Sequence, residues 1–222
     1  YSDLRSAVRG LDVLVSFGSR PPSNWAAVWL SGEWLRMRAG LSSTTPDQFD
    51  AWLDPFFRTE DGTGFDLGTG MYRERGLPNS YDLFTRVHMT DLLSSGYAGR
   101  HHDRLVEFLT AGLRRSLDLQ LSDGSVASGY RSAGQSWVLG AQVALFTAAD
   151  RLGLGSEADR AAARLAAWRA FSSLARWRRP DGTFSPVQNM LAPELRVGYE
   201  RYTADGHYSP LALAFLASAV VA

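Results

Sequence analysis

The sequence predicts an all-α protein built as an incomplete (α/α) toroid of about four helix hairpins. Three observations lead to this prediction: eight segments with helical periodicity, few strand signals, and a weak internal repeat marked by Asp-Gly turns. In such a toroid, one helix of each pair lines the inside and its partner wraps the outside. An open helical array used for protein binding is the alternative with the same helix count. The 222 residues, 45% of them hydrophobic, suffice for one core, so we expect a single domain over residues 1–222.

The helices follow from apolar periodicity and from cap residues. The fourth, for example, begins after Pro78, which has no backbone N–H, at the cap residues Asn79 and Ser80, and ends before Gly96. The only strand signal is a short hairpin in the loop 184–202. We expect helices near residues 3–15, 24–39, 46–57, 80–94, 100–118, 133–151, 157–177 and 209–222.

The internal repeat consists of a helix, an Asp-Gly turn, a loop and a second helix. The tripeptides that mark it begin at Asp61, Asp123 and Asp181, and each follows a helical segment. Asp followed by Gly is typical of tight turns, so we interpret these three carboxylates as turn formers. The charged helices within 3–15, 100–118 and 157–177 are expected to be the outer ones. The inner set, smaller and more apolar, begins near residues 24, 80, 133 and 209.

Every inner helix follows a long loop, so the four loops should share one rim with the helix N-termini. Such a rim favours anions, because free N–H groups and helix dipoles converge there. All three asparagines of the chain, Asn24, Asn79 and Asn189, lie in these loops or at these helix starts. Aromatic rings among amide, guanidinium and imidazole groups suit carbohydrate, since sugar faces stack on rings and hydroxyls take hydrogen bonds. The aromatic and polar residues expected around the rim are Trp25, Tyr81, Tyr130, Arg131, Gln135, Trp137, Tyr199, Glu200, Arg201, Tyr202, His207 and Tyr208.

The helix after Asn79 carries a polar stripe, since Tyr81, Thr85 and His88 fall at i, i+4 and i+7. A histidine two turns into a helix is as often a packing residue as a functional one. Tyr81 and His88 are about 10 Å apart along the axis, so both cannot touch one proton. His101 and His102 open an outer helix and are expected to be solvated.

Composition excludes several classes of function. Lys+Arg and Asp+Glu number 23 each and no basic run occurs, so neither nucleic acid nor a membrane surface is an expected partner. The chain has no cysteine, no HExxH motif and no Gly-rich phosphate loop, so we expect neither a metal nor another cofactor. No segment reaches the length of a membrane span.

Several short motifs, spread over residues 24–222, resemble the helical domain of heparinase II/III-like and related bacterial α/α-toroid polysaccharide-degrading proteins. They are Asn24-Trp25, Tyr81-Asp82 with His88, Gly129-Tyr130-Arg131-Ser132 with Gln135 and Trp137, Glu200-Arg201-Tyr202, and Gly206-His207-Tyr208. The resemblance implies a secreted or cell-envelope protein, with the cytoplasm as an alternative. Relatives often carry a β-rich domain after the toroid, and the apolar run at residues 211–222 leads us to expect a fragment of a longer chain followed by such a domain.

The resemblance also implies β-elimination on a polysaccharide that contains uronic acid. That reaction needs a group that neutralises the C6 carboxylate, a base for the C5 proton and an acid for the leaving oxygen. Asn79 or Asn24, with Arg131, is expected at the carboxylate. His88 or Tyr81 is the expected base, with His207 as a competitor, and Tyr208 or Tyr81 is the expected acid. The expected substrate-binding residues are Asn24, Trp25, Tyr130, Gln135, Trp137, Asn189, Glu200, Arg201, Tyr202 and His207.

Two other functions stay open. Glycoside hydrolysis needs two carboxyl groups, about 5 to 5.5 Å apart for retention and about 6.5 to 9.5 Å apart for inversion. Asp66, Asp82, Glu200 and Asp205 are the candidates, with Asp82 and Glu200 the first pair to test. A non-catalytic module that binds sugars or proteins would keep the aromatic surface and would not need His88.

Overall fold

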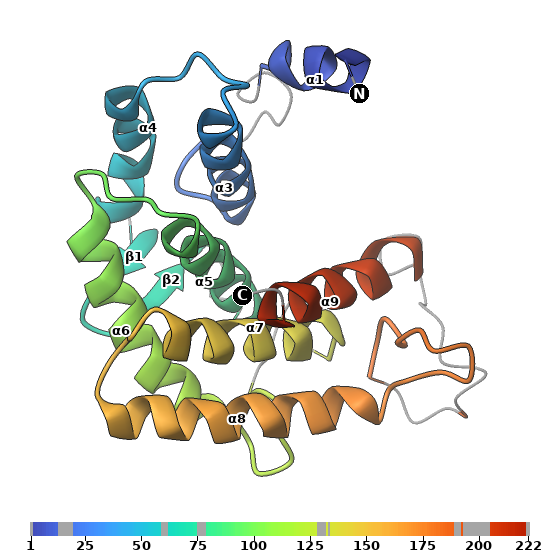
Figure 1. Cartoon of the computed structure of the whole chain (residues 1–222). Coiled ribbons are helices and arrows are strands. Elements are labelled where there is room, and N and C mark those ends of the chain that lie inside the picture. The colour runs from blue at the N-terminus through green and yellow to red at the C-terminus, as the bar shows by residue number, and fades with distance from the viewer. Residues whose placement is uncertain are drawn as a thin grey trace.

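The protein is mostly helical. The computed structural model describes residues 2–12, 20–58, 62–74, 79–127, 132, 134–188, 192 and 205–220. Its helices are α1 (Ser2–Arg9), α3 (Asn24–Arg38), α4 (Pro46–Leu53), α5 (Asn79–Ser94), α6 (His102–Leu119), α7 (Trp137–Arg151), α8 (Glu157–Ala175) and α9 (Asp205–Val220), and a 3-10 turn, η1 (Asp54–Phe57), extends α4 (Figure 1). The all-α prediction is therefore confirmed. The first helix ends at Arg9 rather than at residue 15, the sixth begins at Trp137 rather than at 133, and the last begins at Asp205 rather than at 209.

A small hairpin between η1 and α5 was not predicted. Strands β1 (Gly64–Asp66) and β2 (Met71–Arg73) are antiparallel, with Phe65 opposite Tyr72. The turn between them is closed by Asp66, whose Oδ1 accepts from the backbone N–H of Gly68 at 3.0 Å and of Thr69 at 3.2 Å. Three-residue strands are too short for a periodicity of two to show in the sequence. The hairpin that was predicted within residues 184–202 falls largely outside the described residues.

The helices α3, α5, α7 and α9, here called the inner helices, pack in sequence order, each against the next. Their C-terminal ends meet. Arg151 of α7 donates to Ser94 Oγ of α5 and to the Ser218 carbonyl of α9, both at 3.4 Å. Trp34 Nε1 of α3 donates to the Ser95 carbonyl just after α5 at 3.2 Å.

The N-terminal ends of the inner helices also meet. Trp137, the first residue of α7, stacks on Tyr208 of α9 with ring centroids 6.3 Å apart, and lies 5.6 Å from the Phe84 ring of α5. α5, α7 and α9 touch at both equivalent ends, so these three helices run in the same direction.

The N-terminus of α3 is linked to that of α5 through the hairpin segment, where Glu74 binds Asn24 and the Tyr72 backbone N–H binds Asp82. The N-termini of the inner helices therefore share one edge of the molecule, called the rim below.

The charged helices lie outside this layer. α6 packs on α5 and α7, and α8 packs on α7 and α6 (Figure 1). Twelve of the fifteen residues of α7 are buried, whereas α1 has no buried residue. The buried position of α7 agrees with its apolar composition, whereas the toroid arrangement stays a prediction.

Two of the three Asp-Gly turns have the same geometry. Asp123 Oδ1 accepts from N (2.9 Å) and Oγ (2.6 Å) of Ser125. Asp181 Oδ1 accepts in the same way from N (2.9 Å) and Oγ1 (2.7 Å) of Thr183. The glycines that follow the two aspartates have φ of +84° and +87°, a region that glycine adopts without strain. The prediction of turn-forming aspartates is thus confirmed at these two positions, while Asp61 lies outside the described residues.

None of the described helices combines the length and the apolar character that a bilayer crossing requires.

Candidate functional site

A row of aromatic residues follows the rim. Trp25, Tyr81 and Trp137 are spaced 56 residues apart, and each lies in the first turn of an inner helix. Trp25 is 59% exposed and Tyr81 is half-buried. Trp137 is buried under the half-buried ring of Tyr208, at an interplanar angle of 19°. Tyr208 therefore takes the surface position above the third aromatic residue of the row.

The loop before α7 holds Trp137 in place. Gln135 Oε1 accepts from Trp137 Nε1 at 2.5 Å, and Gln135 itself is buried. Its backbone forms an isolated β-bridge with Val187, in the loop after the Asp181 turn. Ser132 in the same loop has φ of +66°, which is uncommon outside glycine. Two loops that the sequence placed on one rim are thus joined there, with Gln135 supporting the aromatic row rather than open to solvent.

The accessible stripe of α5 differs from the predicted one, because it lacks Thr85 and includes Phe84 and Asp91. Tyr81, Phe84, His88 and Asp91 are partly exposed at spacings i, i+3, i+7 and i+10. Thr85 was predicted to share the stripe, but it is fully buried and its Oγ1 has no hydrogen-bond partner among the described residues. The stripe gains Asp91, which sequence reasoning missed although its spacing from His88 is that of one helix face.

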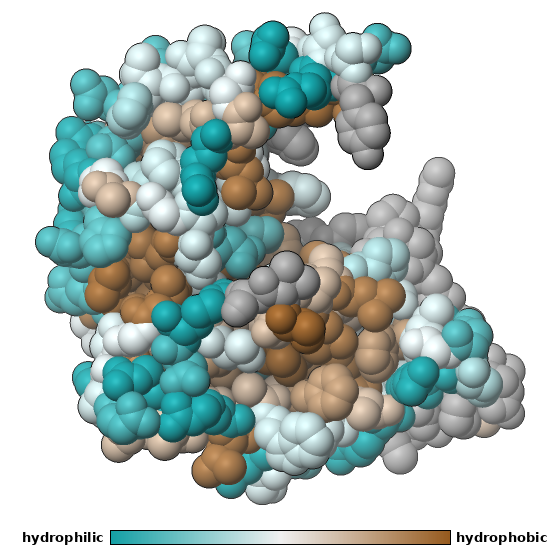
Figure 2. Space-filling model, viewed as in Figure 1, coloured by the Kyte–Doolittle hydropathy of each residue, from teal (hydrophilic) through white to brown (hydrophobic). Residues whose placement is uncertain are grey.

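The residues of α3 that lie 56 positions earlier form an equivalent stripe. Trp25, Val28, Gly32 and Leu35 are all at least partly exposed. α3 and α5 pack against each other, and each of the two stripes begins at a residue of the aromatic row, Trp25 or Tyr81. In Figure 2, the molecule is hollowed between α1 and α3 on one side and α9 on the other.

His88 lies deep in this stripe. Its ring contacts Phe84 edge to face at 4.7 Å and lies 6.3 Å from Phe215 of α9. Burial lowers the pKa of His88 to about 4, so the imidazole is neutral at neutral pH. Its Nε2 is buried without a described partner, and its Nδ1 lies 4.0 Å from Asp91 Oδ2. Burial also raises the pKa of Asp91 to about 6, although the charge of Arg151 acts in the opposite direction.

Asn24 is occupied by a carboxylate of the protein itself. Its Nδ2 donates to both carboxylate oxygens of Glu74, at 3.1 and 2.8 Å, and its backbone N–H donates to Oε2 at 3.2 Å. The Tyr72 hydroxyl donates to the same carboxylate at 3.1 Å. Burial and the Glu74 charge raise the pKa of Tyr72, which keeps this phenol protonated. Glu74 thus lies at the N-terminus of α3, where the helix dipole favours an anion. No sequence motif pointed to it.

Asp82, the first carboxylate proposed for hydrolysis, is buried in the core and pairs with Arg86. Arg86 Nη2 donates to its Oδ2 at 2.6 Å, and both side chains are at most 2% exposed. The backbone N–H of Tyr72 donates to Asp82 Oδ1 at 2.6 Å. Arg86 Nη1 continues to the Gly112 carbonyl of α6 at 2.9 Å. The pair joins α5 to the hairpin and to α6, so its role is structural. Asp66, another candidate, closes the β1–β2 turn and forms an ion pair with Arg73.

His101 is buried, against the expectation that it is solvated. Its ring stacks on Phe57 with centroids 4.8 Å apart, and its Nε2 lies 2.7 Å from Asp54 Oδ1. His102 is partly exposed and lies beside Asp103. Helical periodicity could not predict the burial of His101, because its contact with Asp54 of η1 joins residues 47 positions apart in the sequence.

Several predicted site residues lie wholly or partly outside the described part of the chain. Asn79 and Asp205 begin α5 and α9, and His207 lies in the first turn of α9, but their side chains are outside the described part. The other predicted residues outside it are Tyr130, Arg131, Asn189, Tyr199, Glu200, Arg201 and Tyr202. Within the described ranges, no three His, Asp or Glu side chains come together as metal ligands.

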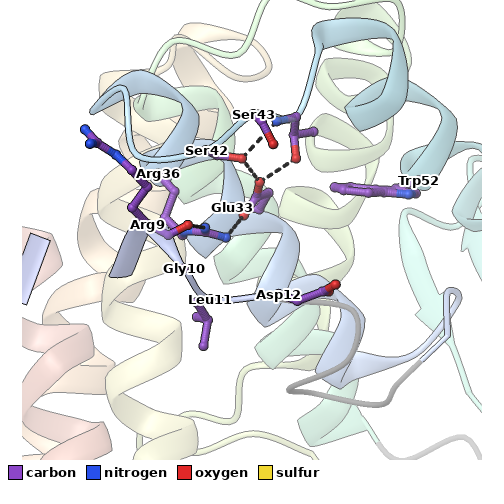
Figure 3. Close-up of a pocket in the computed structure, with 10 residues that line it drawn as sticks. Arg9, Gly10, Leu11, Asp12, Glu33, Arg36, Ser42, Ser43 and Trp52 are labelled. Atoms are coloured by element: carbon purple, nitrogen blue, oxygen red, sulfur yellow. Dashed lines mark hydrogen bonds and ion pairs between the residues drawn. The ribbon is translucent and has the colours of Figure 1, made fainter. Parts of the chain in front are cut away.

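A separate cavity of about 310 Å³ lies toward the other end of α3, next to Glu33, nine residues after Asn24 and thus about 13 Å along the helix. Glu33 is 2% exposed, and its carboxylate accepts from Arg36, Ser42 and Thr44 (Figure 3). Trp52 of α4 forms the opposite wall. The Glu33 carboxylate therefore ties the loop after α3 to the helix, and its position away from the rim separates this cavity from the aromatic row.

No known protein family and no curated protein sequence matches the chain.

Proposed function

We propose that the rim binds a polysaccharide and that the protein cleaves a uronic-acid polysaccharide by β-elimination. In this proposal the inner helices are part of an (α/α) toroid, and their N-terminal rim is the substrate cleft. The observation that carries the proposal is the aromatic row Trp25, Tyr81 and Tyr208 above Trp137. Neighbouring helix axes lie about 8 to 10 Å apart, so such a row can stack on alternate rings of one sugar chain.

The rim also suits an acidic sugar. Four helix N-termini lie on it, and their dipoles favour a negative charge there. Glu74 already lies at the N-terminus of α3, whereas no described carboxylate occupies the N-terminus of α7. A uronate carboxylate bound near α7 and α9 would lie beside Tyr208.

The proposed chemistry uses the phenols. In β-elimination a base takes the C5 proton, the electron pair forms the C4–C5 double bond, and the C4–oxygen bond breaks as an acid protonates the leaving oxygen. Tyr81 and Tyr208 are the described aromatic residues of the rim that can carry protons. His88 lies about two helical turns further along α5 than Tyr81. In this proposal its ring packs against Phe84 and supports the wall of the cleft. Neutralisation of the C6 carboxylate falls to Asn79 and Arg131, as the resemblance implies.

Hydrolysis is the weaker alternative. It needs two available carboxyl groups, and Asp82 and Asp66 are both committed to structural contacts. One observation favours a non-catalytic carbohydrate-binding module. His88 Nε2 is buried, and a module that binds sugars through the aromatic row would not need this residue.

The deciding experiment incubates the protein with a panel of uronic-acid polysaccharides while ultraviolet absorbance and reducing ends are followed together. A rise in both signals shows an unsaturated uronate and supports elimination; Tyr208→Phe should then lose activity and still bind substrate. Reducing ends without absorbance indicate hydrolysis. Binding that depends on Trp25, with neither signal, identifies a binding module.

A further inference from the structure

The outer helix α8 carries a second apolar face that no described element covers. Its inner face, with Ala163, Ala166, Ala170 and Leu174, is buried in the core. On the outer side Leu165 is 61% exposed and Trp168 is 67% exposed. Figure 1 shows α8 along one edge of the molecule, with α7 on its inner side. Isolated exposed apolar residues are ordinary, but a continuous set on one helix indicates an interaction surface.

The exposed apolar set has the spacing of a coiled-coil seam. Six uncharged residues alternate at intervals of three and four, and all six are exposed: Ala158, Ala161, Leu165, Trp168, Ser172 and Ala175. They occupy successive a and d positions over nearly the whole of α8, about 25 Å of helix. The large residues at the centre would insert between side chains of a partner helix, and the small residues at both ends would let the helices approach closely there. We call these six residues the α8 seam.

The residues beside the seam are basic at its centre. Arg164 and Arg169 occupy the flanking g and e positions next to Leu165 and Trp168. Arg164 is still 49% exposed although it pairs with Asp150 and Glu157. Arg169 is exposed and forms no ion pair with a described residue. A partner with carboxylates at its own flanking positions would complement both arginines.

A second copy of α8 does not fit this seam. In a parallel pair, g faces e of the other helix, which places Arg164 against Arg169. In an antiparallel pair, g faces g and e faces e, so each arginine meets its own copy. Both arrangements bring like charges together at the centre of the interface, which disfavours self-association.

We propose that the α8 seam binds an acidic amphipathic helix of a partner protein, with apolar residues at heptad spacing and Glu or Asp beside them. This surface lies on an outer helix, and it does not depend on the proposed activity of the rim. The partner inserts apolar knobs around Trp168 and places its carboxylates near Arg164 and Arg169.

A designed probe tests the proposal. It is a labelled three-heptad peptide with Leu at a and d and Glu at e and g, whose like charges disfavour self-pairing; a matched peptide carries Lys at e and g. Fluorescence anisotropy should show the Glu peptide binding at least about tenfold more tightly than the Lys peptide. Leu165→Glu with Trp168→Glu should abolish binding, and Arg169→Glu should shift the preference toward the Lys peptide.

The matched control is Leu213→Glu, since Leu213 is 46% exposed on α9, away from the seam. It should leave binding unchanged. Circular dichroism checks that each variant folds, as expected for substitutions at exposed positions. Equal binding of the two peptides, or binding that survives the double substitution, overturns the proposal. A dimer in size-exclusion chromatography that Trp168→Glu dissociates overturns it as well, because the seam would then belong to a second copy.

Discussion

Replacing Asp82 with alanine should lower the free energy of unfolding by about 3–5 kcal/mol. The substitution leaves the Arg86 guanidinium, at most 1% exposed, as a buried charge without its carboxylate. It also removes the acceptor of the Tyr72 backbone N–H. The cost exceeds that of an exposed ion pair, which is about 0–1 kcal/mol, because water cannot replace the lost partner.

For a chain of this length, the same loss corresponds to a decrease in melting temperature of about 6–20 °C. Urea unfolding followed by tryptophan fluorescence measures it directly, since the seven tryptophans are spread along the chain. The double variant Asp82→Leu with Arg86→Met removes both charges and should lie within about 2 kcal/mol of the wild type, because no buried charge remains unpaired.

The outcome also decides between two roles for Asp82. A variant Asp82→Ala that unfolds within about 1 kcal/mol of the wild type would refute the structural role argued from the ion pair. If the double variant folded normally and had lost a hydrolytic activity of the wild type, Asp82 would return as a catalytic carboxylate.

Three further predictions follow from single sites. His88 stays neutral in the folded protein down to its pKa of about 4, whereas the unfolded chain takes up the proton near pH 6.5. The free energy of unfolding should therefore fall, by about 3 kcal/mol, as the pH drops through this window. The raised pKa of Asp91 acts in the opposite direction, so the comparison is made with His88→Gln, and an identical pH dependence in that variant would contradict the argument. Trp25→Ala should weaken binding of an oligosaccharide by about tenfold in affinity electrophoresis at unchanged melting temperature, while alanine at the exposed tryptophan of α8 should not. Gly182→Ala should lower the free energy of unfolding by about 1–2 kcal/mol, because of the positive φ alone. Gly124→Ala should lower it further, because the added Cβ would lie 2.1 Å from a backbone oxygen of α8. Urea unfolding measures both losses, and equal losses would show that the two turns are packed alike.

The buried position of α7 and the peripheral position of α6 were accessible from sequence because they depend on composition along each helix. α7 has almost no charged residue and proves to be nearly wholly buried, whereas α6 is charged on one side and lies outside. The β1–β2 hairpin was missed for the opposite reason. Its strands are too short to show a period, and it is positioned by Gly70 packing on Gly112 of α6, a contact distant in sequence.

The candidate site was predicted only in part. The aromatic residues at the helix starts were recognised, because Trp and Tyr beside cap residues are visible locally. The exposure of each ring was not predicted, since Trp137 is covered by Tyr208, which lies 71 residues further along the chain.

The sequence by itself determined the helices, their order and the Asp-Gly turns, because periodicity, caps and glycine at positive φ act over a few residues. Only the tertiary structure decided which polar groups are available for chemistry. Asp82 and His101 looked available in sequence, yet one is paired inside the core and the other lies against Phe57 and Asp54. Periodicity orients a side chain about its own helix axis, but the neighbour that covers or pairs with it comes from a distant part of the chain, and burial and pairing set its charge and access to solvent.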